Sequence, residues 1–305
     1  MATLVSPSMR QPDALLPSGQ LWLPRASLVA CVRSVVVRST VGYALDDEQR
    51  INRFPATPMC SLSWWFEGSS EMLLPADADN MPGLESPRMP PPGRWVFGGP
   101  QTQPTSTWCP GPVHSMVVLL MPDALHLLTG LEPAELTDRF VDAADVLPPE
   151  WLAMCANVQD LPDDAQRIAC LENFLEPRWW ACRPELPLAV QRHADWAVYL
   201  TQRAATSSVG RSLRQLERRI KRWAGLPLRE LRGFGRAERA FFEAVEADVA
   251  QTDVRWADVA AAAGFADQPH LCRVTRRITG YAPQALYEGM QQQEAFWVYR
   301  LWAEG

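Results

Sequence analysis

The sequence predicts an α+β protein with a β-rich amino-terminal part, helices appended to it, and an all-α carboxyl-terminal part. Twelve of the 27 prolines fall between Pro55 and Pro112, and this density excludes long helices from that stretch. After Pro122 the apolar residues recur three or four positions apart, which is typical of helices. The length of 305 residues suits about two domains. We expect a flexible arm over 1–19, a first domain over 20–190 and a second over 191–305.

In the first part, short apolar runs bounded by turn residues predict strands. These runs cover 28–41, 59–66, 94–98 and 115–121. The proline-rich stretch over 75–92 predicts a surface loop. Helices are expected at 123–129, 133–140, 149–157, 163–175 and 187–203, with Asp163 capping the fourth.

Composition narrows the class of protein. A content of 47% hydrophobic and 21% charged residues is typical of a soluble globular chain. No apolar run approaches the roughly 18 residues of a membrane span, and the first 19 residues lack a secretory pattern, so we expect a cytoplasmic protein. The seven cysteines form no C-x-x-C pair, which favours free thiols. The four scattered histidines and the lack of a phosphate-binding glycine loop favour a protein without metal, cofactor or enzymatic activity.

The net charge of −6 is unevenly distributed. Residues 207–305 carry +3 and the rest −9, and the stretch 211–239 alone holds ten basic against three acidic side chains. Such a concentration of positive charge favours binding of an anion, nucleic acid included. A solvated helical face gives the same pattern, and charge alone leaves the two interpretations equal. Lys221, the only lysine, lies in this stretch.

The clearest local pattern lies in 255–280. A short helical segment ends at Gly264, the residue type that accepts a left-handed turn. Asp267 is a good cap for a second helix, and Pro269 in its first turn costs no hydrogen bond. Leu271 and Ile278, seven positions apart, are expected to face inward. An ordinary pair of antiparallel helices satisfies the same pattern.

The opposite side of that second helix carries polar side chains. They are Gln268, Pro269, Cys272, Arg273 and Arg276. A short helix, a glycine turn and a second helix with a polar first turn are typical of a helix-turn-helix, whose second helix enters the major groove of DNA. Arginine pairs with guanine and glutamine with adenine, each through two hydrogen bonds.

The same residues resemble the signature of the AraC/XylS family of bacterial transcription regulators. The matching pattern is Ala260-x3-Gly264-Phe265-x-Asp267-Gln268-x-His270-Leu271-x-Arg273, followed by Arg276, Gly280 and Pro283. The family's DNA-binding module has two helix-turn-helix units joined by a helix, so the resemblance implies a first copy upstream. Its matching residues are Ser212, Arg214, Leu216, Arg218, Ile220 and Gly225, with Leu231, Arg236 and Ala240 in the connecting helix.

The sequence departs from this pattern at several positions. Thr275 stands where the family usually has phenylalanine, and Pro227 comes one residue early. Before the first unit the usual Ala-x3-Gly reads Thr206-x3-Gly210. Gly233 and Gly235 are expected to weaken the connecting helix by roughly 1 kcal/mol each relative to alanine. We therefore expect the second unit to be the stronger of the two.

The amino-terminal part resembles the sensor region of some AraC-type regulators at 53–58, 61–64, 97–102 and 131–139. This resemblance implies a cupin-like β-barrel that binds a small effector or mediates dimers, so 20–190 would be a sensor or dimerisation domain and 191–305 the DNA-binding domain. Its aromatic residues either line an apolar pocket or pack in the core, and core packing is favoured. These residues are Trp64, Trp65, Trp95, Phe97 and Trp108.

Together the pattern and the resemblance imply two sets of DNA contacts. Bases are expected to be read by Arg214, Glu217, Arg218, Gln268, Pro269, His270, Cys272 and Arg273. Phosphates are expected to be bound by Arg211, Arg219, Lys221, Arg222, Arg276 and Arg277. The expected partners are double-stranded DNA, RNA polymerase and a small-molecule effector, without membrane or cofactor, for a monomer or homodimer. An adaptor with a degenerate helix-turn-helix module is the main alternative to a transcription regulator, and a DNA-repair enzyme fusion is a weaker one.

Overall fold

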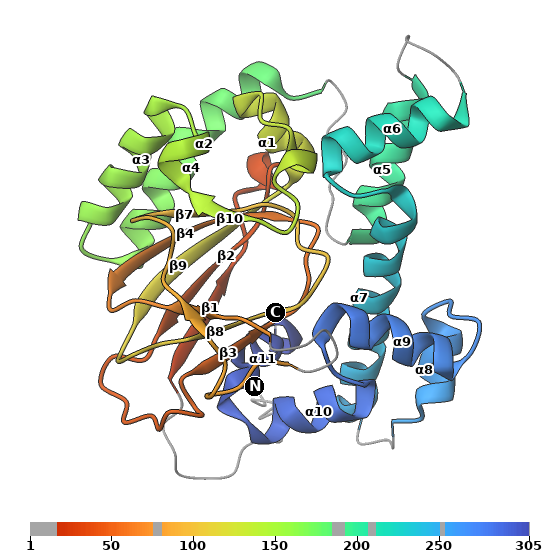
Figure 1. Cartoon of the computed structure of the whole chain (residues 1–305). Coiled ribbons are helices and arrows are strands. Elements are labelled where there is room, and N and C mark those ends of the chain that lie inside the picture. Colours follow the sequence, from red (N-terminus) through yellow and green to blue (C-terminus); the bar gives the residue numbers. More distant parts are fainter. Residues whose placement is uncertain (1–16, 76–80, 185–192, 207–211, 251–253, 305) are drawn as a thin grey trace, which may run out of the picture.

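A computed structural model describes residues 17–75, 81–184, 193–206, 212–250 and 254–304. In Figure 1 two antiparallel sheets form the first part and helices surround them. The first sheet has the order β1 (Ser18–Trp22), β2 (Val32–Ser39), β9 (His114–Leu120), β4 (Cys60–Glu67), β7 (Val96–Gly98), β10 (Phe140–Asp142). The second has the order β3 (Ile51–Phe54), β8 (Thr105–Trp108), β5 (Glu71–Leu73), β6 (Arg88–Met89). The expected β-rich first part is confirmed.

The two faces of the first sheet pack against different parts of the chain, because successive side chains of a strand point to opposite faces. On β9, Met116 and Val118 are fully buried in the main core, whereas Ser115 and Val117 face the other side. The main core lies under four helices, which Figure 1 shows over one side of the sheets. They are α1 (Pro122–Thr129), α2 (Ala143–Val146), α3 (Pro149–Asp160) and α4 (Asp164–Cys182).

Aromatic residues of the first part pack as core residues. Trp64 and Phe97 are fully buried in the main core, and the Trp64 indole donates to the Cys155 carbonyl of α3 at 3.2 Å. Trp65, Trp95 and Trp108 are half-buried, and none of the five lines the cavity described below. The favoured interpretation, core packing, is therefore confirmed for Trp64 and Phe97.

Two helix predictions in the first part are wrong in extent. The stretch 133–140 forms only the 3-10 turn η2 (Pro133–Glu135), and Phe140 belongs to β10, where it pairs with Gly98. Between η2 and β10 the chain turns at Asp138, which adopts φ +57°. The helix expected to end at 175 continues as α4 past Pro177, because Trp179 packs into the core and outweighs the lost hydrogen bond. Asp163 caps this helix as predicted, accepting from the Gln166 amide at 2.9 Å.

The last third is helical, as predicted. Its elements are α5 (His193–Thr206), α6 (Leu213–Ala224), α7 (Leu228–Val249), α8 (Trp256–Ala262), α9 (Gln268–Thr279), α10 (Pro283–Gln292), η3 (Glu294–Phe296) and α11 (Trp297–Glu304). The expected start of α5, before residue 193, lies outside the described residues. None of the helices in the described ranges is both long and apolar enough to span a membrane.

The connecting helix α7 runs unbroken through Gly233 and Gly235. A Cβ on Gly235 would lie 3.1 Å from the backbone of Ala194 in α5, so the glycine permits a close crossing of these two helices. Packing of α5 on α7 therefore offsets the intrinsic cost that the sequence indicated.

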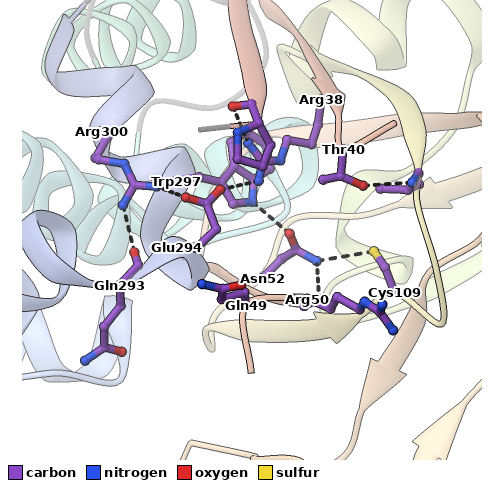
Figure 2. A network of polar contacts seen from close by, with 12 residues as sticks. Arg38, Thr40, Gln49, Arg50, Asn52, Cys109, Gln293, Glu294, Trp297 and Arg300 are labelled. Carbon is purple, nitrogen blue, oxygen red and sulfur yellow. Dashed lines mark hydrogen bonds and ion pairs between the residues drawn. The ribbon is translucent and has the colours of Figure 1, made fainter. Parts of the chain in front are cut away.

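The carboxyl-terminal segment packs back on the sheets and buries Phe296 and Trp297. Figure 2 shows the polar network that fixes it. Arg38 of β2 pairs with Glu294, and Arg300 holds the other carboxylate oxygen at 2.7 Å. The Trp297 indole donates to the Asn52 side chain at 2.8 Å. This segment thus fastens the helical part to both sheets.

Candidate nucleic-acid interface

The second predicted unit is a helix-turn-helix formed by α8 and α9. Gly264 between them adopts φ +77°, the left-handed conformation predicted for it. Asp267 caps α9 by accepting from the His270 amide at 2.7 Å, and Pro269 occupies the first turn. Leu271 and Ile278 are buried, as expected. A small cluster of six buried residues holds the unit together: Ala240, Val259, Ala260, Ala263, Phe265 and Leu271.

The exposed side of α9 carries most of the expected contact residues. Gln268, Pro269, Arg273 and Arg276 are exposed, and they follow one another along the solvent side of the helix. His270 and Cys272 are half-buried, and the His270 ring stacks edge-on against Phe265 at 5.3 Å between centroids. Arg277 is half-buried, 4.0 Å from a carboxylate oxygen of Glu230 on α7.

Thr275, the polar residue at an expected core position, is buried on the inner side of α9. One turn later the Thr279 hydroxyl donates to the Thr275 carbonyl at 2.9 Å. Both threonines line a cavity between the two parts of the molecule.

The first unit contains α6, which begins with a capping box. The Ser212 hydroxyl accepts from the Gln215 amide at 3.3 Å, and the Gln215 side chain accepts from the Ser212 amide at 3.2 Å. The contact residues expected on this helix are exposed: Arg214, Glu217, Arg218 and Lys221. The turn before it, from Ser207 through Gly210 to Arg211, lies outside the described residues. The structure therefore gives no position for the Arg211 phosphate contact.

The carboxyl-terminal end of α6 is docked on the first part. Arg222 makes a two-pronged ion pair with Glu132, whose oxygens lie 2.7 and 3.0 Å from the guanidinium nitrogens. Gly225 packs on Pro133, and the Thr137 hydroxyl donates to the Gly225 carbonyl at 3.3 Å. Arg219 is half-buried in the same region. The side of α6 that was expected to contact phosphate is thus partly occupied by η2 and its flanking residues.

The helix before α6 is α5, the first helix of the first unit, and two buried acids attach it to the rest of the molecule. Asp123 of α1 accepts from the Trp196 indole and from Arg203, both at 2.9 Å. Glu238 of α7 contacts His193, at the start of α5, and Arg33 of β2, again at 2.9 Å each. Burial favours protonation of Glu238, but His193 and Arg33 outweigh it and lower the pKa of this carboxyl to about 2.

Sequence reasoning missed Asp123, Glu132 and Glu238. The residues of α5 and α6 that these acids contact lie 45 to 90 positions away from them in the chain. No local spacing pattern therefore reveals the contacts. All seven cysteines are free, and the described residues contain no group of three or more His, Cys, Asp or Glu arranged to hold a metal ion.

Comparison with known proteins identifies the second unit. Residues 248–286 match the family model described as bacterial regulatory helix-turn-helix proteins, AraC family. No curated protein matches the chain. Similar solved structures include an apo variant of ToxT from Vibrio cholerae strain SCE256, at 12% identity and a TM-score of 0.37 over 82% of this chain and 96% of that one. ToxT from Vibrio cholerae O395 is similar at 11% identity and a TM-score of 0.36, over 80% of this chain and 97% of that one.

A further ToxT structure with bound unsaturated fatty acid is similar at 12% identity and a TM-score of 0.34, over 79% of this chain and 94% of that one. The family match covers the elements α8 and α9 and the start of α10. The chain therefore carries, in α8 and α9, the helix-turn-helix of the AraC family of bacterial regulatory proteins.

Proposed function

We propose that this protein is a sequence-specific, DNA-binding transcription regulator whose activity responds to a small effector. The observation that carries the proposal is the exposed polar face of α9, in an AraC-family helix-turn-helix whose turn and cap are both formed. Gln268 and Arg273 would read base edges in the major groove. Arg276 and Arg277, at the end of the same helix, would bind phosphate and supply affinity.

The two recognition helices support a site with two contact patches. The connecting helix α7 has 22 residues, so it is about 33 Å long at about 1.5 Å per residue. Successive major grooves on one side of DNA are about 34–36 Å apart. One monomer would then place α9 in one groove and α6, through Arg214, Glu217 and Arg218, in the next. Because α6 is partly docked, its half-site would be the less strictly specified.

Selection of bound DNA from a random pool tests this function directly. The full chain should enrich one asymmetric motif with a strong half-site and a weaker one about 10 base pairs away. On that motif Arg273→Ala should cost about 1–3 kcal/mol and relax the preference at one or two positions. Arg276→Ala should weaken binding to every sequence and make the salt slope shallower by about one unit.

Arg94→Ala, which removes a positive charge from an exposed site in the first part, is the matched control and should leave DNA affinity unchanged. Equal losses on specific and random DNA for Arg273→Ala would contradict base reading.

The docking of α6 favours one alternative, an adaptor in which this module binds the first part or a protein rather than DNA. The ion pair between Arg222 and Glu132 is the observation behind it. An adaptor has no affinity for DNA to lose as salt is raised, whereas a regulator loses affinity steeply between 50 and about 200 mM salt. A salt series on the selected motif separates the two.

A further inference from the structure

A cavity of about 250 Å³ lies between the sheets and the carboxyl-terminal helices. One wall is the outer face of the first sheet, where Val36 and Val117 point away from the main core. The other walls are α7, the inner side of α9, α10 and α11, and Figure 1 shows these elements facing the sheets. The cavity therefore adjoins both the first part and the helix proposed to read DNA.

The lining is mostly apolar. Phe234 and Phe241 of α7 and Leu271 and Ile278 of α9 are among the apolar residues that line it. A closed cavity of about 150 Å³ lined by Leu, Ile and Phe stays free of water and binds benzene. A volume of 250 Å³ with the same kind of lining is suited to a larger apolar molecule, with two rings or a short branched chain.

Three polar groups of the lining are buried without a hydrogen-bond partner among the described residues. They are the Tyr299 hydroxyl, the Trp302 indole nitrogen and Nε2 of His193. Tyr299 and Trp302 lie three positions apart on α11, and therefore on one side of that helix. Arg33 lies between Trp302 and His193. Its guanidinium is 5.7 Å from the centre of the Trp302 ring and forms an ion pair with Glu238, and Glu238 also contacts the His193 ring. The Tyr299 hydroxyl and the Trp302 indole N–H are donors, and buried donors nearly always have acceptors, so these two groups favour a ligand with an oxygen atom.

The charges around the cavity favour a neutral ligand. Arg38, in the lining, is paired with Glu294, and Arg33 is paired with Glu238. Glu238 itself lines the cavity and holds its negative charge because its pKa is low. The only lysine of the chain, Lys221, is exposed on α6. A carboxylate ligand would find both arginines already paired and would lie near the buried negative charge of Glu238. The cost of removing its charge from water would therefore not be offset.

We propose that this cavity binds a neutral, lipophilic small molecule about the size of two rings that carries one oxygen acceptor. The inference deepens the effector response in the proposed function and rests on it for its regulatory meaning. Leu271, Thr275 and Ile278 line the cavity from the inner side of α9, and the Ile278 carbonyl accepts from the Ala56 amide at 2.7 Å. A bound molecule would set the position of α9 relative to the first part, and so relative to α6.

Three probes of one size test the ligand class on the full chain without DNA. They are 2-acetylnaphthalene, which is neutral with a carbonyl acceptor, naphthalene, which has none, and 2-naphthoate, which is charged. Calorimetric titration should show one site for 2-acetylnaphthalene, with at least about tenfold weaker binding of 2-naphthoate. Naphthalene should bind with intermediate affinity. Equal or tighter binding of 2-naphthoate, or no binding of any probe, would overturn the proposal.

Two variants locate the site. Thr275→Phe fills the cavity from α9 and should weaken binding of 2-acetylnaphthalene by at least about tenfold. Ala285→Phe adds the same ring on the exposed side of α10 and should leave probe binding unchanged. Tyr299→Phe should weaken 2-acetylnaphthalene toward the affinity of naphthalene, while naphthalene itself binds as before. Full binding of the ketone to Thr275→Phe would place the probe elsewhere and overturn the site.

If Thr275→Phe fails to fold, the probe series and Tyr299→Phe remain decisive. A separate measurement follows DNA affinity with and without saturating 2-acetylnaphthalene. Probe binding that leaves DNA affinity unchanged would uphold the site and contradict the effector response. If the protein binds the probe but enriches no DNA motif, the proposed function is contradicted and the ligand site is upheld.

Discussion

The two helices proposed to read DNA, α6 and α9, have similar local features and very different surroundings. Both begin with a side-chain cap, from Ser212 and Asp267, and both end at a glycine in the left-handed conformation. The inner residues of α6, Ile220 and Ala224, belong to the main core that also contains the first sheet. The α8–α9 unit instead has its own small cluster of six buried residues.

The difference lies in what each unit is fastened to. The first unit is joined to the amino-terminal part by Asp123, Glu132 and Glu238, all of them acids outside α5 and α6. The exposed face of α9 has no comparable ion pair among the described residues, apart from the distant contact of Arg277 with Glu230. Two helices with the same pattern therefore differ in how freely they can approach DNA, because tertiary contacts restrict one of them.

Asp123→Ala should give the largest effect on this comparison. Asp123 is 2% exposed, and its removal leaves Arg203 and the Trp196 indole without their acceptor. We expect a loss of about 3 kcal/mol in the free energy of unfolding, measured in urea. Hydrogen exchange should show the loss in α5 and α6 and spare α8 and α9. Asp195→Ala, an exposed acid on α5, is the control, and equal loss in both units would contradict the difference described above.

Glu238 makes the attachment of the first unit dependent on pH. Its pKa in the folded chain is about 2, below the ordinary value of 4.5, so its contribution is fully present above pH 4.5 and is lost as the pH falls toward 2. The shift corresponds to about 3 kcal/mol. The stability difference between the wild type and Glu238→Gln should stay constant from about pH 6 to about pH 5 and shrink from about pH 4.5 to about pH 3. A difference that stays constant over this range would show that the carboxylate charge is not the stabilising feature.

Removing the two caps compares the helices directly. Asp267→Ala and Ser212→Ala should each destabilise their helix by about 1 kcal/mol, because each leaves an amide at the first turn unpaired. Asp267→Ala should also weaken specific DNA binding more than Ser212→Ala does, since α9 is proposed to be the main reading helix. The reverse order in a binding titration would assign the stronger half-site to α6. The Asp→Asn change at 267 keeps an acceptor and serves as the control.

Glu132→Gln should have the smallest effect, because Arg222 is largely exposed to solvent. Release of Arg222 should raise DNA affinity, by less than about fivefold. Glu150→Gln removes an exposed charge from α3 and is the matched control. In the Arg222→Gln background the Glu132→Gln change should have no effect on affinity. An increase that persists there would mean that Glu132 acts through general charge and not through this ion pair.

Local sequence was sufficient to predict the structure wherever contacts within a few residues determine it. Asp163 and Asp267 cap helices through bonds to amides three positions away, and Gly264 needs its conformation whatever surrounds it. The alternating pattern of β9 gives its two faces from the backbone alone. These short-range signals were enough to predict the β-rich first part, the helical last third and the second helix-turn-helix.

Long-range packing decided the remainder. Phe140 joins a strand because Gly98 lies beside it, and α7 tolerates Gly235 because α5 crosses there. The docking of α6 depends on Glu132, 90 positions before its partner. The polarity of Thr275 was visible in the sequence, but the cavity beside it exists only where α9 meets the first sheet. The sequence by itself therefore determined which two helices carry a side-chain cap and a polar exposed face. Only the tertiary structure decided which of them is docked on the first part, because ion pairs and cavities form between segments that no local pattern connects.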